Sequence, residues 1–275
     1  MATLAFFAVL TAARAQYYYK DIVTTSQINK TYQLLKANKV SLVNFGTFIQ
    51  NQPVEDGIQL EQTIDPKHNS VTTYTNTVAA GESWLISNYN NNGLLSKSTD
   101  STKETTTTTL YSYDANNRLA QINSTAMAKD NSIVIEVHNW IYNSSGQPER
   151  MIKIKNSTDT TFVNFTADEK GNPGEEKATR NKYSLGITYY YYDTNNRLTD
   201  VARYHKKADR ILPDYMFEYN DNNQLTQMIV VPDGSSDYQT WRYTYNDQGL
   251  KQQEACYNKQ KQLAGKIEYI YKYNN

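Results

Sequence analysis

The segment YYYDTNNRL at residues 190–198 decides the fold of this chain. Tyr190 and Tyr192 stand two positions apart, so both rings would project from one face of a β-strand. Asp193 can begin a type I turn, because its side chain can accept a hydrogen bond from the backbone two residues further on. Asn196, the fourth residue of that turn, is one of the few residue types besides glycine that tolerate a positive φ. The segment therefore predicts a strand that ends in a bulged hairpin turn.

The same turn pattern, in which Gly or Asn stands three residues after Asp or Asn, occurs seven times. The first residues of these turns are Asn90, Asp114, Asn143, Asp168, Asp193, Asn220 and Asn246. Their fourth residues are Gly93, Asn117, Gly146, Gly171, Asn196, Asn223 and Gly249. The starts are 24 to 29 residues apart, which accommodates two strands of about ten residues, a tight turn and a return loop. We therefore predict an all-β fold, an up-and-down antiparallel meander of about seven β-hairpin repeats over residues 81–275. We expect the sheet to be twisted and open, with room to curl toward a barrel.

Aromatic residues two positions apart precede most of these turns, and they allow two interpretations. The pairs are Tyr111 and Tyr113, Trp140 and Tyr142, Tyr190 and Tyr192, Phe217 and Tyr219, and Tyr243 and Tyr245. Such a stripe can form the core by cross-strand packing, or it can stay exposed and stack on sugar rings or grip a peptide. We favour the interpretation as a core, because an aromatic stripe that runs so regularly along one face of a sheet needs other parts of the protein to cover it. Tyr189 and Tyr191 make the opposite face of one strand aromatic as well, so the candidate ligand-binding residues are Trp140, Tyr189, Tyr191 and Trp241.

Two segments, YSYDANNRL at 111–119 and YYYDTNNRL at 190–198, resemble the YD repeat of RHS-type proteins. That motif is a Tyr-Asp pair followed by a Gly-Arg-Leu-like step. The resemblance covers about residues 84–275, although Asn replaces Gly in three copies and Arg appears only as Arg118 and Arg197. It implies a secreted or envelope-associated array of β-hairpins from a Gram-negative bacterium. Large family members wrap a toxin in such repeats, and seven copies are too few to enclose one.

The first 80 residues differ from the repeats. An apolar run at 4–12 followed by Ala13-Arg14-Ala15 resembles an export signal, so we predict a signal peptide at 1–15. We predict an irregular N-terminal β region or cap at 16–80 and favour first strands of the same sheet. Residues 40–49 and 58–64 read as strands, and residues 28–38 have a weak helix-like spacing.

Residues that could carry chemistry are few and scattered. His68, His138 and His205 lack metal-ligand spacing, and a single Cys256 has no second cysteine for an internal disulfide. Carboxylates that could pair for glycoside cleavage are Glu136, Asp168, Glu169, Glu175, Glu176 and Glu218. Because acids are common on any surface, we predict no catalytic residue, no metal and no cofactor. The formal net charge of zero gives no electrostatic reason to expect nucleic acid as a partner.

The sequence thus predicts an exported, non-catalytic β-repeat protein that binds an envelope glycan or protein, or that has a structural role. It would be secreted or reside in the periplasm or cell envelope, without membrane insertion. The first alternative is a secreted carbohydrate-active hydrolase with a carboxylate pair. The less favoured one is an outer-membrane β-barrel, because strands such as 111–122 lack a continuous lipid-facing apolar stripe.

Overall fold

The computed structural model describes residues 17–54, 58–232 and 237–274. The predicted signal peptide at 1–15 lies outside them. One helix, α1 (Lys20–Ala37), precedes all the strands. In chain order the strands are β1 (Val40–Ile49), β2 (Gln52–Pro53), β3 (Ile58–Asp65), β4 (Ser70–Thr77), β5 (Gly81–Tyr89), β6 (Leu95–Thr102), β7 (Thr105–Tyr113), β8 (Leu119–Ala128), β9 (Ile133–Tyr142), β10 (Pro148–Lys155), β11 (Asp159–Ala167), β12 (Pro173–Arg180), β13 (Tyr183–Tyr192), β14 (Leu198–His205), β15 (Arg210–Tyr219), β16 (Leu225–Val230), β17 (Gln239–Tyr245), β18 (Lys251–Tyr257) and β19 (Leu263–Tyr273).

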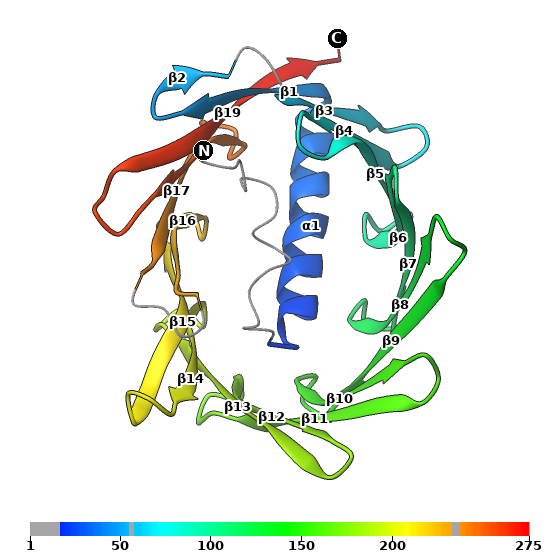
Figure 1. Cartoon of the computed structure of the whole chain (residues 1–275), viewed down its shortest axis with the longest axis vertical. Helices are drawn as coiled ribbons and strands as arrows, with labels where there is room; N and C mark the ends of the chain where they lie inside the picture. Colours follow the sequence, from blue (N-terminus) through cyan, green and yellow to red (C-terminus); the bar gives the residue numbers. More distant parts are fainter. Residues whose placement is uncertain (1–16, 55–57, 233–236, 275) are drawn as a thin grey trace.

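The strands form one antiparallel meander that closes on itself as an 18-stranded barrel (Figure 1). From β3 onward each strand pairs with the next, and β1 pairs with both β3 and β19. In the closing pair Val43 lies opposite Tyr271, and Phe45 lies opposite Tyr269. The all-β prediction is therefore confirmed, whereas the open sheet of about seven hairpins is wrong. The physical reason is that strands β1, β3 and β4, which lack the turn motif, complete the ring, and that β1 pairs with the last strand, β19.

All seven predicted turns have the expected backbone. Their fourth residues have φ between 58° and 87°. In the turn at Asp193, the amide of Asn196 donates to the Asp193 carbonyl at 3.1 Å, and the amide of Asp193 donates to the Arg197 carbonyl at 3.0 Å. The Asp193 side chain accepts hydrogen bonds from the amides of Asn195 and Arg197, each at 2.9 Å. A register shift at Tyr192, opposite Leu198, marks the predicted bulge.

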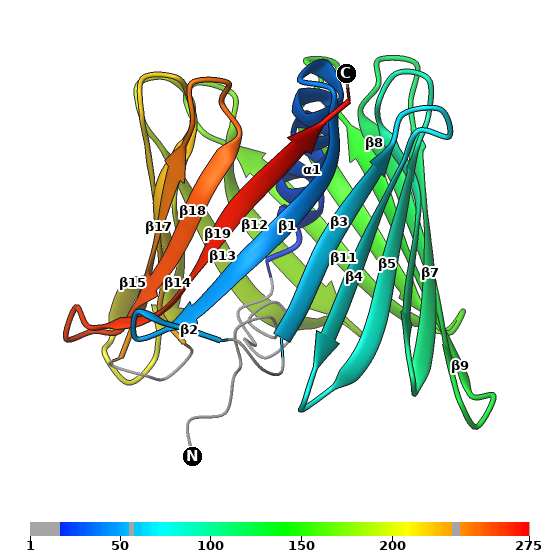
Figure 2. The same ribbon diagram turned by 90° about the horizontal axis from the view of Figure 1, so that it is seen from above.

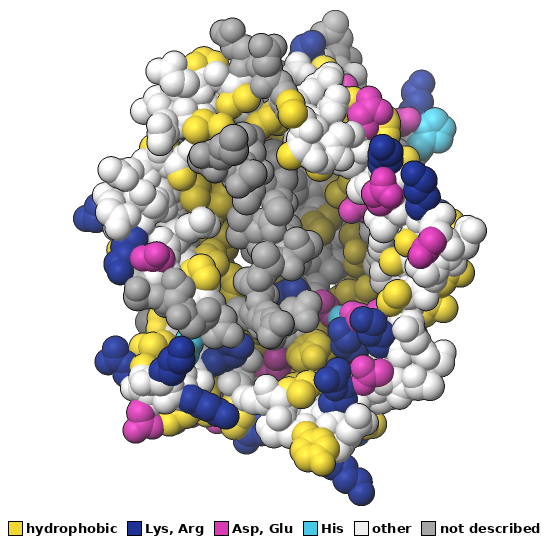
Figure 3. All heavy atoms as spheres, viewed as in Figure 1, with side chains coloured by type: hydrophobic (Ala, Val, Ile, Leu, Met, Phe, Trp, Pro, Cys, Tyr) yellow, Lys and Arg dark blue, Asp and Glu magenta, His cyan; other side chains and the backbone are white. Residues whose placement is uncertain are grey.

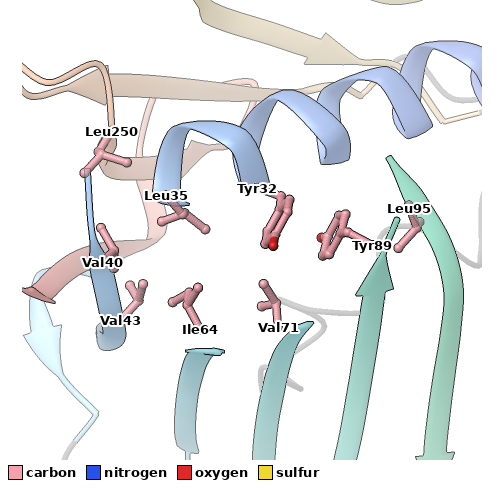
Figure 4. Close-up of a cluster of buried hydrophobic side chains, with 9 residues drawn as sticks. All are labelled: Tyr32, Leu35, Val40, Val43, Ile64, Val71, Tyr89, Leu95 and Leu250. Atoms are coloured by element: carbon pink, nitrogen blue, oxygen red, sulfur yellow. The ribbon is translucent and has the colours of Figure 1, made fainter. Parts of the chain in front are cut away.

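Inside the ring lies α1 (Figures 1 and 2). Several of its side chains pack against the inner wall. Tyr32 and Leu35 face Val43, Ile64 and Val71 (Figure 4). The helix ends where Lys39 takes a φ of 55° and turns the chain into β1. In the described part of the chain, no helix has the length and apolar character that a membrane crossing requires.

Alternation along the strands separates an inner wall from an outer wall. On β13, Tyr190 and Tyr192 point inward with Val201 and Leu198 as cross-strand partners. Met151 and Val163, opposite each other on β10 and β11, are completely buried on the inner wall. Full burial of such a side chain contributes about 1.5–3 kcal/mol to the stability of the fold. The hydrophobic core therefore lies between the inner wall and α1.

Candidate functional site

The middle and the end of α1 are fixed to the inner wall by both ring stacking and hydrogen bonds. The ring of Tyr32 stacks on that of Tyr89 with centroids 3.7 Å apart and an interplanar angle of 5°. The Asn29 side chain accepts a hydrogen bond from the Leu95 amide at 2.8 Å and donates one to the Tyr113 hydroxyl at 3.4 Å. The helix therefore has one defined position against β5, β6 and β7.

The beginning of α1 is capped by a carboxylate from the barrel wall. Glu176 on β12 is 2% exposed, and its Oε2 accepts hydrogen bonds from the amides of Tyr18 and Tyr19, each at 2.9 Å. The same oxygen accepts a 2.6 Å hydrogen bond from the Tyr190 hydroxyl. Burial raises the pKa of Glu176, although these three hydrogen bonds oppose the shift. The carboxylate thus satisfies amides at the end of the helix where the macrodipole is positive.

A second charged contact lies beside this cap. Nδ1 of His138 on β9 is 2.6 Å from the Asp21 carboxylate in the first turn of α1, and its Nε2 is 2.9 Å from Glu136. Lys153 on β10 is 2.7 Å from the other oxygen of Glu136. Burial lowers the pKa of His138, but hydrogen bonds and charge from the two carboxylates outweigh this and raise it to about 9. Hydrogen bonds from His138 and Lys153 lower the pKa of Glu136 to about 2.

We refer to Asp21 on the helix with Glu136, His138 and Glu176 on the wall as the helix clasp. Its partners come from α1, β9 and β12, which are far apart in the sequence. These contacts join the beginning of α1 to β9 and β12. The clasp therefore positions α1 inside the barrel.

The tyrosines that precede the turns link successive hairpins. Before five of the turns, the hydroxyl of such a tyrosine donates a hydrogen bond of 2.7–2.9 Å to the backbone carbonyl of the residue that follows the previous turn. The pairs are Tyr113 and Leu95, Tyr142 and Leu119, Tyr192 and Pro173, Tyr219 and Leu198, and Tyr245 and Leu225. Tyr271 on β19 donates a similar bond of 2.6 Å to the Lys251 carbonyl, although Lys272 follows it in the sequence. This bond explains why the motif uses tyrosine at the position before Asp or Asn.

The seven turns lie at one end of the barrel, because alternate connections of an up-and-down meander share an end (Figure 2). We call this end the turn rim. Side chains bridge neighbouring turns there: Asn92 donates to the Asn117 side chain at 3.1 Å, and Arg197 donates to the Asn220 carbonyl at 2.8 Å. The rim therefore presents amide, carboxylate and guanidinium groups from neighbouring turns.

In two turns the fifth residue is an arginine that covers the gap to the next turn. The Cζ of Arg118 lies 4.4 Å from the centroid of the Tyr142 ring, and the Cζ of Arg197 lies 5.1 Å from the centroid of the Tyr219 ring. The Asn220 turn has the shorter Gln224 at this position. A groove of about 700 Å³ opens there, between the Asn220 and Asn246 turns, and we call it the rim groove. The side chains in it that matter below are those of Asn222, Gln224, Tyr243, Tyr245, Asp247 and Gln248.

The structure does not bring the four predicted ligand-binding residues together. Trp140 and Trp241 are 5% and 7% exposed and lie on the inner wall. Tyr189 and Tyr191 alternate with the inward Tyr190 and therefore lie on the outer wall, where Tyr191 is 48% exposed. Sequence reasoning did not find the rim groove. Gln224 is no signal by itself, because the fifth turn position is Arg in only two of the seven turns and Gln147 holds it in the Asn143 turn.

The acids that could have formed a catalytic pair mostly have structural partners. Glu176 caps α1, Glu136 pairs with His138 and Lys153, and Asp168 accepts the turn amides of Lys170 and Asn172. Glu175, the neighbour of Glu176, points to the outer wall and lies 3.0 Å from Lys177.

Cysteine and metal chemistry find little support in the described residues. Cys256 is buried, and burial raises the pKa of its thiol to about 11, which disfavours the thiolate that a nucleophile requires. Within residues 17–54, 58–232 and 237–274, no group of three or more His, Cys, Asp or Glu residues is placed to hold a metal ion.

The outer wall is mixed in character. Large exposed apolar side chains gather on β5 to β11: Trp84, Ile86, Leu110, Met127, Ile133, Ile135, Ile141 and Phe162. The cross-strand register also places charged side chains outward, among them Lys97, Arg150, Lys177, Glu218 and Arg242. Figure 3 shows Lys, Arg, Asp and Glu side chains around the margin of the face seen down the barrel.

No protein-family model matches the sequence, and no curated protein matches it. Among solved structures, the chain is similar to a porin-like protein from Bacteroides uniformis, with 10% identity and a TM-score of 0.40 over 86% of this chain and 97% of that one. It is also similar to a chain of the Tc holotoxin pore of Photorhabdus luminescens, with 14% identity and a TM-score of 0.36 over 78% of this chain. The match spans 12% of that toxin chain. At these TM-scores the likenesses assign the chain to no family and carry no argument about its function.

Proposed function

We propose that this protein is an exported, non-catalytic β-barrel that binds a glycan or a protein of the bacterial envelope. One observation carries the proposal: α1 lies inside the barrel and is fastened there by the helix clasp. The inner aromatic wall, which would otherwise be the natural chamber for a substrate, packs against the protein's own helix. A ligand would then use the turn rim or the outer wall.

The hydrolase alternative finds less support. Glycoside cleavage needs two carboxyl groups that face each other across an open cleft. Glu176 and Glu136 are committed to α1 and to the neighbouring wall, and Glu175 points away from them on the outer wall. The resemblance to YD repeats and the signal-like N-terminus both favour export to the envelope of a Gram-negative bacterium.

The proposal is tested by incubating the purified full chain with a glycan array and with solubilised envelope proteins. We expect saturable binding of one class of ligand and no release of reducing ends from a polysaccharide panel. Polysaccharide cleavage that disappears on replacing one acid by its amide would contradict the non-catalytic assignment and favour the hydrolase.

A second candidate function, an outer-membrane barrel, is favoured by the exposed apolar side chains on β5 to β11. Against it, Arg or Lys near the middle of a bilayer costs about 2–4 kcal/mol each, and Arg150, Lys177 and Arg242 point outward. Expression of the full chain followed by fractionation separates the candidates. A monodisperse protein without detergent supports the binding barrel, and recovery only from detergent-extracted outer membranes supports the membrane barrel.

A further inference from the structure

We infer that the rim groove is the ligand site and that its ligand is an uncharged saccharide. This inference rests on the proposed binding function and adds the site and the class of ligand. Copies of the repeat differ at the fifth turn position, which is Arg in two of the seven turns and Gln in the Asn143 and Asn220 turns. Arg118 and Arg197 each extend over the tyrosine ring of the following repeat, at 4.4 Å and 5.1 Å, and so cover the gap between two turns.

Gln224 occupies the corresponding position in the Asn220 turn but leaves its gap open. Its side-chain nitrogen donates to the Gly249 carbonyl at 3.2 Å, and its oxygen accepts a hydrogen bond from Asn220 at 2.9 Å. Glutamine is shorter than arginine, and both polar atoms of this glutamine are tied to the turns. The half-buried rings of Tyr243 and Tyr245 therefore border a groove of about 700 Å³, a size typical of small-molecule sites.

The polar groups in the groove suit hydroxyl groups. Asn222 and Gln248 bring side-chain amides, and Asp247 brings a carboxylate. Tyr273 donates to the side-chain oxygen of Gln248 at 2.9 Å, which orients this amide and directs its nitrogen away from that contact. Amides and carboxylates can pair with neighbouring sugar hydroxyls, and tyrosine rings can pack on the apolar face of a pyranose ring.

The charge of the groove disfavours anionic ligands. Among the described residues that line it, Asp247 is acidic and none is a lysine or arginine. Lys251 lies nearby, with its Nζ 4.8 Å from the centroid of the Tyr243 ring, but it is paired with Glu254 at 2.9 Å. An anionic sugar would therefore be repelled by Asp247. An uncharged saccharide meets no such cost, so it is the class of ligand that the lining favours.

The repeat supplies a replacement that should block the groove with little disturbance of the fold. Gln224→Arg places at this position the residue that two sibling turns already carry. We expect the Kd for the saccharide to rise about tenfold or more, because the guanidinium would cover Tyr245 as Arg197 covers Tyr219. The probes are cellohexaose, maltohexaose and mannohexaose, with hexagalacturonate as the anionic comparison, in calorimetric titrations of the full chain.

Matched controls come from the equivalent positions of other turns. Asn222→Ala should weaken binding of the same hexasaccharide, whereas Asn195→Ala, at the third position of the Asp193 turn, should not. Arg118→Gln, the reverse exchange at a sibling turn, should also leave the Kd unchanged. Circular dichroism and thermal midpoints confirm that each variant is folded.

The outcomes separate the site from the proposed function. A hexasaccharide that binds the wild type and Gln224→Arg equally well overturns the site, while the binding function stands. Tighter binding of hexagalacturonate than of the neutral probes overturns the class of ligand. Wild-type protein that captures an envelope protein but no hexasaccharide also overturns this inference alone, whereas failure to bind any glycan or envelope protein contradicts the proposed function itself.

Discussion

The Tyr219 hydroxyl donates a 2.9 Å hydrogen bond to the backbone carbonyl of Leu198, the first residue of the strand that follows the previous turn. The same relationship links other successive hairpins around the barrel. Strand pairing alone fixes neighbouring strands, but this bond also ties one hairpin to the next near the turn rim. The tyrosine before five of the seven turns therefore has a role that its ring alone does not explain.

Tyr219→Phe should lower the free energy of unfolding by about 1 kcal/mol, because the half-buried carbonyl of Leu198 loses its donor while the ring stays in place. Urea unfolding followed by circular dichroism measures the change. Tyr191→Phe, on the exposed outer wall, is the matched control and should have little effect. Equal losses in the two variants would contradict a specific role for the hydroxyl.

Gly249→Val should cost about 1–3 kcal/mol of stability, because a β-branched residue is strained at a φ of 76°. Its Cβ would lie 3.4 Å from the Gln224 side chain, an ordinary van der Waals contact, so the cost comes from the backbone. Asn117→Gly, at the same position of another turn, should be neutral or slightly stabilising, since glycine adopts the φ of 60° without strain. Thermal midpoints of the two variants check this. A Gly249→Val midpoint equal to that of the wild type would count against the turn geometry.

The turns could be predicted from the sequence because their chemistry is local. The positions of Asn196 and Gly249 require a positive φ, and few residue types adopt one readily. The residue types at these positions therefore reveal the turn in the sequence alone. Closure of the barrel depends on contacts between distant residues, such as Val43 opposite Tyr271. Nothing in residues 40–49 signals that their partner is the last strand, which is why the sequence favoured an open sheet.

The helix and the rim groove were harder to predict for a related reason. Tyr32 and Leu35 contact one part of the wall, whereas Val23 packs toward another, so α1 has no single apolar stripe. Its cap, Glu176, lies 157 residues away from Tyr19 in the chain. The groove lies between two neighbouring turns, and Gln224 differs there from Arg118 and Arg197 of two sibling turns. Such a difference has meaning only once the turns are known to be neighbours.

The helix clasp predicts a loss of stability at alkaline pH. The pKa of His138 is raised from 6.5 to about 9 in the folded protein. Because the pKa is raised on folding, the stability that protonated His138 contributes is fully present below about pH 6.5 and is lost as the pH rises through about 9. The contribution is on the order of 3 kcal/mol. In urea unfolding, the difference between wild type and His138→Gln should therefore shrink from about pH 6 to about pH 10. Parallel pH curves for the two proteins would contradict the clasp.

Glu176 allows the cap of α1 to be tested apart from its charge. Glu176→Gln keeps an acceptor oxygen for the amides of Tyr18 and Tyr19. It also removes the cost of burying a charged carboxylate, the same cost that raises the pKa of Glu176 in the folded protein. At pH 7 the free energy of unfolding of Glu176→Gln should be close to that of the wild type. Glu176→Ala leaves three buried donors without an acceptor, so it should lower the free energy of unfolding by about 2 kcal/mol or more. Hydrogen exchange should then accelerate in the first turn of α1 more than around Tyr32, which keeps its stack on Tyr89. Uniform acceleration along α1 would mean that the helix is held as one unit and that the carboxylate does not cap its beginning.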